Sequence, residues 1–154
     1  MIRSALAAAA LTLALPAAAF AQAQAPQERL RLADEGVDDA TFSGAPFAAN
    51  GHVRMWSWTM NKDRSEAAGV TFNTLATLHE FDCQARSLGY VRVEAYLDNA
   101  FMLGEDADTD IQPAEAGTVS EVVMGLACDT PNDGDYVGSP AEARAMVTEF
   151  FSEQ

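Results

Sequence analysis

The sequence has few basic side chains, and this absence excludes several kinds of partner. Nine Lys and Arg residues stand against 23 Asp and Glu in 154 residues, which gives a formal net charge of −14. Clustered Lys and Arg bind phosphate groups, so the charge balance argues against nucleic acid and equally against an anionic lipid surface. The length allows one domain. We therefore expect a small acidic domain with neither of these partners.

Catalytic sequence motifs are also missing. The chain has two histidines, and Cys83 stands where the second His of an HExxH zinc motif would be. It contains no G-x-S-x-G, P-loop or G-x-G-x-x-G. On a strand His79 and Glu80 would point to opposite faces and could not act together. We predict a protein that is not an enzyme and has no cofactor, with a small hydrolase using His79 or His52 as the least favoured alternative.

The apolar residues at the start of the chain are typical of a secretory signal peptide over residues 1–21. Arg3 supplies the positive charge, an Ala- and Leu-rich stretch follows, and the A-x-A site predicts cleavage between Ala21 and Gln22, with Ala23 as a second possible end of the signal. The apolar stretch is too short to span a bilayer comfortably. No cysteine lies near the cleavage site, so the sequence predicts a periplasmic or secreted protein without a lipid anchor.

The predicted export indicates the state of the only two cysteines, Cys83 and Cys128. An exported chain meets oxidising conditions, which favours a disulfide between them. The alternative is a zinc site formed with His52 and His79, but no C-x-x-C or H-x-x-x-H pair is present to begin such a site. We expect the disulfide and no metal.

Hydrophobic patterning predicts strands followed by helices. Residues 22–40 are polar and acidic and are expected to form a tail that enters a first short strand, while residues 41–154 form the single domain. Alternation predicts strands over 53–60, 70–83 and 90–97, with a short edge strand near 101–103, and residues 61–69 are expected to be a loop or a short helical turn. Short links between successive strands favour an antiparallel sheet.

Two helices are expected after the strands, each with a start signal. Thr118 with Glu121 and Ser139 with Glu142 fit capping boxes, and Pro140 occupies the first helical position of the second helix. The expected apolar stripes comprise Val119, Val122, Val123 and Leu126 in the first helix, and Ala143, Met146, Val147 and Phe150 in the second. This order predicts an α+β fold, a small antiparallel sheet with a disulfide-tethered helix and an additional C-terminal helix.

Two further groups of residues could carry a function. The alternate carboxylates of residues 105–110 resemble a calcium loop, but Ile111 and Gly117 occupy the positions where an EF-hand needs Gly and Glu. A solvated acidic loop is the preferred interpretation, with a looser calcium site as the alternative, and residues 129–135 fail the same test. Arg54, Trp56 and Trp58 share one strand face, and we expect an aromatic core with Arg54 at its edge in preference to an exposed aromatic patch.

The run from Thr77 to Arg86, with its aromatic-Asp-Cys sequence ending in Cys83, resembles the signature of the surface-adhesin protein E family. The second half of that signature resembles residues 113–128, which end in Cys128, and the resemblance covers about residues 37–129. It implies a small antiparallel sheet, one attached helix and a Cys83–Cys128 bridge. The chain departs from the family pattern in its missing lipid-anchor cysteine, in residues 115–117 and in its C-terminal helix.

The resemblance also implies a role. Its named function is adhesion to host extracellular proteins, so we expect a non-catalytic exported bacterial protein that binds an extracellular or envelope protein. The alternative is a periplasmic housekeeping protein with no host ligand.

Overall fold

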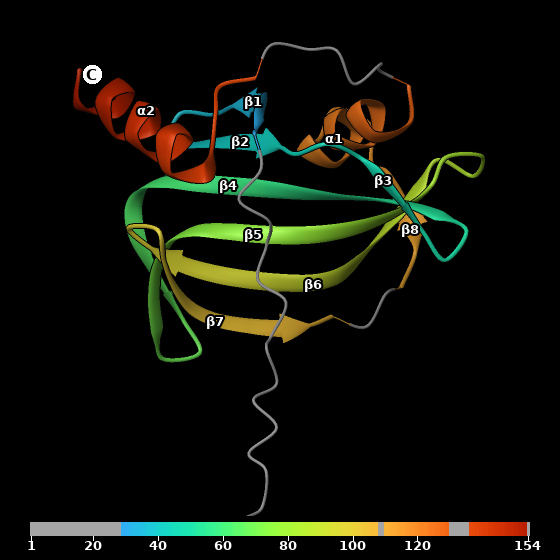
Figure 1. Ribbon diagram of the computed structural model, residues 1–154, viewed down its shortest axis with the longest axis horizontal. Coiled ribbons are helices and arrows are strands. Elements are labelled where there is room, and N and C mark those ends of the chain that lie inside the picture. The colour runs from blue at the N-terminus through green and yellow to red at the C-terminus, as the bar shows by residue number, and fades with distance from the viewer. Residues whose placement is uncertain (1–28, 108–109, 130–135, 154) are drawn as a thin grey trace, which may run out of the picture.

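The structure is a computed structural model, and it describes residues 29–107, 110–129 and 136–153. Figure 1 shows an antiparallel sheet with two helices. The α+β prediction, with a disulfide-tethered helix and a second helix at the C-terminus, is confirmed. The signal segment 1–21, its cleavage site and residues 130–135 lie outside the described residues.

The sheet is built mainly from hairpins between strands that are close in sequence. Its strand order is β1-β2-β4-β5-β6-β7, while β3 pairs with β4 and β8 pairs with β6. The strands are β1 (Arg31–Glu35), β2 (Asp39–Ser43), β3 (Phe47–Ala49), β4 (His52–Ala67), β5 (Val70–Asp82), β6 (Ser87–Leu97), β7 (Ala100–Asp106) and β8 (Gln112–Pro113). The predicted strands over 53–60, 70–83 and 90–97, and the edge strand near 101–103, are present.

Two segments contribute more to the sheet than expected. The acidic stretch 22–40 was expected to be a tail that enters a first short strand; β1 is that strand, and the start of β2 also lies within the stretch. Its polarity fits a strand at the border of the sheet, where one side faces solvent. Residues 61–69 were expected to be a loop or a short helical turn, but β4 continues through them to Ala67. Pairing of Asn61 with β2, and of residues 65–67 with β5 across the Ala68-Gly69 turn, overrides their polar composition.

Three two-residue turns set the register of the hairpins. Asn50-Gly51, Ala68-Gly69 and Asp98-Asn99 each have positive φ at both residues, as the favoured hairpin turns require. Ala68, at φ +51°, is the one residue of these six that is neither Gly, Asn nor Asp. A left-handed conformation costs such a residue about 1 kcal/mol. The extended β4–β5 hairpin therefore forms despite a locally unfavourable turn.

The two helices pack on opposite faces of the sheet. Helix α1 (Val119–Cys128) buries Val123 and Met124 with Met55 and Phe81. Helix α2 (Pro140–Ser152) buries its own apolar residues in a second cluster that contains Trp56, Trp58, Phe42 and Tyr96. Neighbouring residues of β4 alternate between these two clusters, so the clusters lie on different faces. Trp58 is 1% exposed, which confirms that the aromatic pair forms core.

The helix starts agree with the sequence only at α2. Ser139 and Glu142 form the predicted capping box, with Pro140 in the first turn. The box at α1 is wrong, because the Thr118 side chain makes no cap bond and donates instead to the Glu115 carbonyl, 2.6 Å away. The Glu121 carboxylate accepts from the Gly117 N–H at 2.8 Å.

The predicted stripes are right for Val123, Ala143 and Val147, which are buried, but both stripes are rotated relative to the true buried faces. In α1, Val119 and Val122 are exposed and Met124 is buried, since Cys128 must face Cys83 and Met124 lies one turn before it. In α2, Met146 and Phe150 are exposed. The buried face of α2 consists of Pro140, Ala143, Arg144, Val147 and Phe151.

A Cys83–Cys128 disulfide joins the end of β5 to the end of α1. It closes a loop of 45 residues. Because both sulfurs are used in this bond, the zinc alternative with His52 and His79 is wrong. The disulfide holds α1 against the face formed by Met55, Phe81 and Leu88.

We predict that replacing both Cys83 and Cys128 by Ser lowers the free energy of unfolding by about 4 kcal/mol, since the unfolded chain regains the freedom of a loop of this length. Urea denaturation of the two forms measures the difference. The intact mass of the unmodified protein should rise by two hydrogens on reduction. A loss below about 1 kcal/mol would show that α1 is held by its apolar contacts alone.

Candidate binding face of the sheet

The residues singled out from the sequence are dispersed in the structure. Arg54 forms an ion pair with Glu80, with 2.6 Å between Nη2 and Oε2. Arg92 donates to Glu94 and to Asp106, and these two hydrogen bonds, the one to Glu94 above all, raise the pKa of the Arg92 guanidinium. Among the described residues no group of three or more His, Cys, Asp or Glu could hold a metal ion. Residues 108 and 109 of the acidic 105–110 stretch lie outside the described residues.

His79 forms a contact that the sequence did not suggest. Its Nε2 lies 2.7 Å from the Ser57 hydroxyl oxygen, and its ring stacks on Phe81 and is tilted against Tyr90. Glu80 binds Arg54 on the other face of β5, as the alternation predicted. Ser57 and His79 are diagonal neighbours on adjacent strands β4 and β5. Strand alternation places both on the same face, but their contact follows only once the register of the two strands is known.

Burial lowers the pKa of His79 to about 4. The ring is therefore neutral at neutral pH, and its Nδ1 has no hydrogen-bond partner among the described residues. Both side chains of the pair are almost fully buried in the sheet. Ser57 and His79 consequently form an internal hydrogen bond beneath the residues that cover this face.

The hydrogen-bond ladder between β4 and β5 is interrupted at a bulge of several residues in β4. Met60 pairs with Thr74 and Ser65 pairs with Phe72, so four residues of β4 stand opposite Asn73 alone. Bulges bend a strand and leave backbone groups without ladder partners. Beyond the bulge the hairpin continues as an arm, defined here as residues 65–72.

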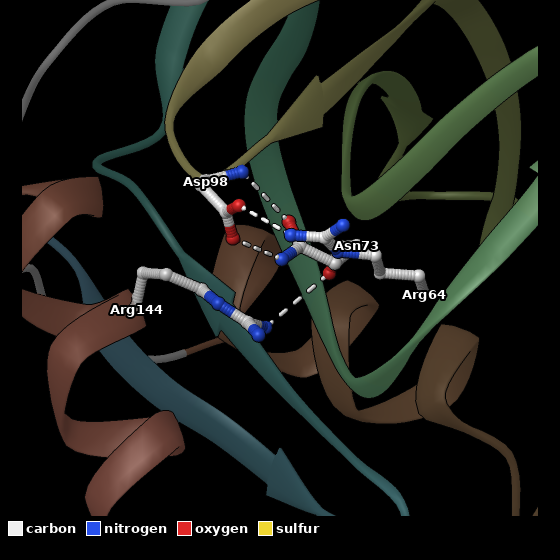
Figure 2. Close-up of polar contacts among 4 residues, drawn as sticks. All are labelled: Arg64, Asn73, Asp98 and Arg144. Carbon is white, nitrogen blue, oxygen red and sulfur yellow. Dashed lines mark hydrogen bonds and ion pairs between the residues drawn. The ribbon is translucent and has the colours of Figure 1, made fainter.

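Arg144 of α2 provides donors for the carbonyls at this bulge. Its Nη1 donates to the Asn61 carbonyl at 2.6 Å and to the Asn73 carbonyl at 3.4 Å. Figure 2 shows the guanidinium reaching from the helix to the strand pair. Burial lowers the pKa of Arg144 from its usual value, and the charge of Asp98 opposes that shift. One helical side chain thus replaces the missing ladder bonds.

The β6–β7 turn is attached to the same bulge. The Asn73 amide donates to the Asp98 carboxylate at 2.8 Å, and the Asp98 N–H donates to the Asn73 side-chain oxygen at 3.1 Å. Arg64 adds an exposed ion pair to Asp98 at 3.0 Å. These contacts connect β4, β5, the β6–β7 turn and α2 at one point and fix where the arm leaves the sheet.

The arm and the last strands enclose an apolar groove of about 260 Å³. Its wall on the arm includes Val70 and Phe72, and its floor on β5, β6 and β7 includes Leu75, Val93 and Leu103. These floor residues point to the same face as Met55 and Phe81, because paired residues of adjacent strands share a face. The groove therefore lies on the face that α1 covers elsewhere. An apolar hollow of this kind is typical of a ligand- or partner-binding surface.

Comparison with known proteins identifies the family. The family model for surface-adhesin protein E matches residues 43–129. The chain belongs to the surface-adhesin protein E family. No curated protein and no solved structure matches the chain. Among the described residues no helix is long and apolar enough to cross a membrane.

The adhesin family match contains most of the candidate binding face. It begins at the end of β2 and ends after α1, so it includes the arm, the groove, Asn73, Asp98 and both cysteines. Helix α2 lies outside it, as the resemblance implied, and yet supplies Arg144. A segment beyond the family match thus stabilises the bulge within it.

Replacing Arg144 by Met should lower the free energy of unfolding by about 2 kcal/mol, because two buried carbonyls lose their donor. Amide hydrogen exchange of residues 65–72 should also become faster, since the arm loses its anchor. Arg86→Met is the matched control: Arg86 is 46% exposed in a surface pair with Asp129, and its loss should cost well under about 1 kcal/mol. Equal effects of the two substitutions would contradict the role of Arg144.

The lowered pKa of His79 predicts a stability that falls on acidification. The unfolded state binds a proton near the ordinary pKa of 6.5, whereas the folded state resists it down to about 4. The contribution is therefore complete above pH 6.5 and is lost as the pH falls to 4, by up to about 3 kcal/mol. His79→Leu should remove this part of the pH dependence, while His52→Leu in its exposed position should retain it. Urea denaturation at several pH values provides the measurement, and parallel profiles for His79→Leu and the unmodified protein would contradict it.

Proposed function

We propose that the protein is an exported, non-catalytic binding protein that acts on an extracellular or envelope protein. Membership of the surface-adhesin protein E family is the observation that carries this proposal. The disulfide supports export, because such bonds form and persist in oxidising compartments. The apolar groove beside the arm supplies a surface on which a partner could dock.

Export by the predicted signal peptide belongs to the same proposal. Cleavage between Ala21 and Gln22 would leave a chain that begins with a short, glutamine-rich polar segment, followed by β1 at Arg31. This places the whole sheet, both helices and the disulfide in the exported part. The net charge of that part, −15, favours solubility and attracts basic partner surfaces.

Lys62 offers a direct test of where the protein is displayed. It is the only lysine of the chain and is exposed on β4. A membrane-impermeant amine-reactive biotin reagent applied to intact cells should label the protein, and Lys62→Arg, which leaves the chain terminus as the only amine, should lose most of the label. A protein on the cell surface is labelled and is cut by added protease, whereas a periplasmic protein is protected from both until the outer membrane is opened.

Protection from both reagents in intact cells would overturn surface display and favour the periplasmic housekeeping alternative. Retention in the cytoplasm at full length would overturn export itself. Partner capture then examines the binding role, with the destabilised Cys83→Ser/Cys128→Ser chain, which lacks the disulfide, as the control for folding. Failure of the folded chain to retain any extracellular or envelope protein would contradict that role.

A further inference from the structure

The sheet has two borders, β1 and β7, and an isolated bridge to Gly138 covers only Leu30, the residue before β1. Beside β1, the N–H of Leu30 donates to the Gly138 carbonyl at 2.6 Å and the Leu30 carbonyl accepts from the Val137 N–H at 2.7 Å. At the other border β7 is the last strand in the sheet order, and no described segment pairs with its outer side. An edge strand presents unpaired N–H and C=O groups that can accept another strand. Backbone pairing is therefore available at β7.

The free border of β7 coincides with the apolar groove. Leu103 of β7 lines the groove, and Glu105, two residues further, lies on the same side of the strand. A bulge at Met102 breaks the regular register before these residues. The regular part available for pairing is thus residues 103–106. A strand added there would place alternate side chains over the groove formed by Val93, Leu103 and the arm.

The charge of this region indicates the chemistry of the added strand. Glu105 is the one ionisable residue that lines the groove. A second copy of the exported chain would bring another net charge of −15 and another Glu105 to the same border. Like charges placed opposite one another destabilise strand pairing. A partner strand that places a basic side chain opposite Glu105 would instead stabilise the pairing, because opposite charges across two strands attract.

We propose that the protein binds an extended segment of its partner by strand addition to β7. The segment adds its backbone to residues 103–106, places alternate apolar side chains in the groove and sets a Lys or Arg against Glu105. Backbone pairing supplies affinity in this mode and the alternate side chains supply selectivity. This inference rests on the proposed binding function and names the surface and the class of partner.

A defined peptide tests the inference on the purified chain. The probe is Thr-Val-Thr-Val-Thr-Lys-Thr, acetylated and amidated, whose Val and Lys side chains share one face of a strand. Its control carries Glu in place of Lys. NMR titration to millimolar peptide should shift the amides of residues 103–106 and the methyl groups of Val93 and Leu103. The Lys peptide should bind about three- to fivefold more tightly than the Glu peptide, as expected for an exposed ion pair.

Two matched protein variants examine side-chain recognition. Glu105→Lys should reverse the preference, so that the Glu peptide binds more tightly than the Lys peptide. Leu103→Glu should abolish the shifts. Leu32→Glu is the control, because Leu32 is 44% exposed on β1 at the opposite border, and it should leave binding unchanged. Circular dichroism of each variant establishes that the sheet is retained.

Peptides N-methylated on alternate residues examine backbone pairing. In an added strand only every second N–H faces the protein. Methylation of one set should therefore abolish binding, and methylation of the other set should be tolerated. Equal effects of the two sets would overturn strand addition and leave apolar docking alone. Absence of shifts at millimolar peptide would overturn the inference, as would concentration-dependent shifts at β7 without peptide, which would indicate a second copy.

The results are separable from those for the proposed function. A chain that retains a partner equally well with Leu103→Glu and without it would refute the β7 site while supporting the binding role. A chain that binds the peptide as described but is retained in the cytoplasm would refute export and leave the β7 site supported.

Discussion

The fold depends on the bulge between β4 and β5, where the hydrogen-bond ladder of these two long strands is interrupted. Four residues of β4 face Asn73 alone, and the carbonyls of Asn61 and Asn73 bond to Arg144 from a helix 71 or more residues later in the chain. A buried carbonyl without a donor would cost free energy. The guanidinium offers several donors in a fixed plane, so one side chain can satisfy carbonyls on two strands. This contact couples the position of α2 to the bend of the sheet.

The bend determines which parts of each face are covered. On one face α2 packs against Trp56 and Trp58, and on the other α1 packs against Met55 and Phe81, held there by the disulfide. Helix α1 has ten residues, and the groove opens where β5, β6 and β7 continue toward the arm. The arm curves over this area because the bulge turns it out of the plane of the sheet. The groove is thus a consequence of the bulge and of the place that α1 takes on the sheet.

Local patterns in the sequence were sufficient for the parts of the fold that depend on neighbouring residues. Alternation located the centre of β4 and most of β5 and β6, and Ser139-Pro140 located the start of α2. The same reasoning failed for residues 61–67, where β4 continues because Asn61 pairs with β2 and residues 65–67 pair with β5. It was right only in part for the faces of both helices, because Cys128 and Arg144 orient them through contacts 45 and more residues away in the chain.

The candidate site was less accessible to sequence reasoning than the fold. Asn73, Asp98 and Arg144 are 25 to 71 residues apart and belong to no motif, and their association requires the register of three strands. Arg64 and Lys62 fell in a segment expected to be a loop or a short helical turn, so no face could be assigned to them. The Asp98-Asn99 turn left a local signal, since both residues tolerate the positive φ that a two-residue hairpin turn needs.

The acidic composition also acquires a more specific meaning from the structure. Several carboxylates that the sequence presents as a solvated excess have internal partners: Glu94 accepts from Arg92 and Tyr96, and Glu80 accepts from Arg54. Basic residues are few, and Arg54, Arg92 and Arg144 are each engaged inside the fold. The ratio of acidic to basic side chains is consequently higher at the surface than in the sequence as a whole. An acidic protein with few cations on its surface favours partners that contribute basic side chains, and Glu105 lies at the groove where such a side chain would arrive.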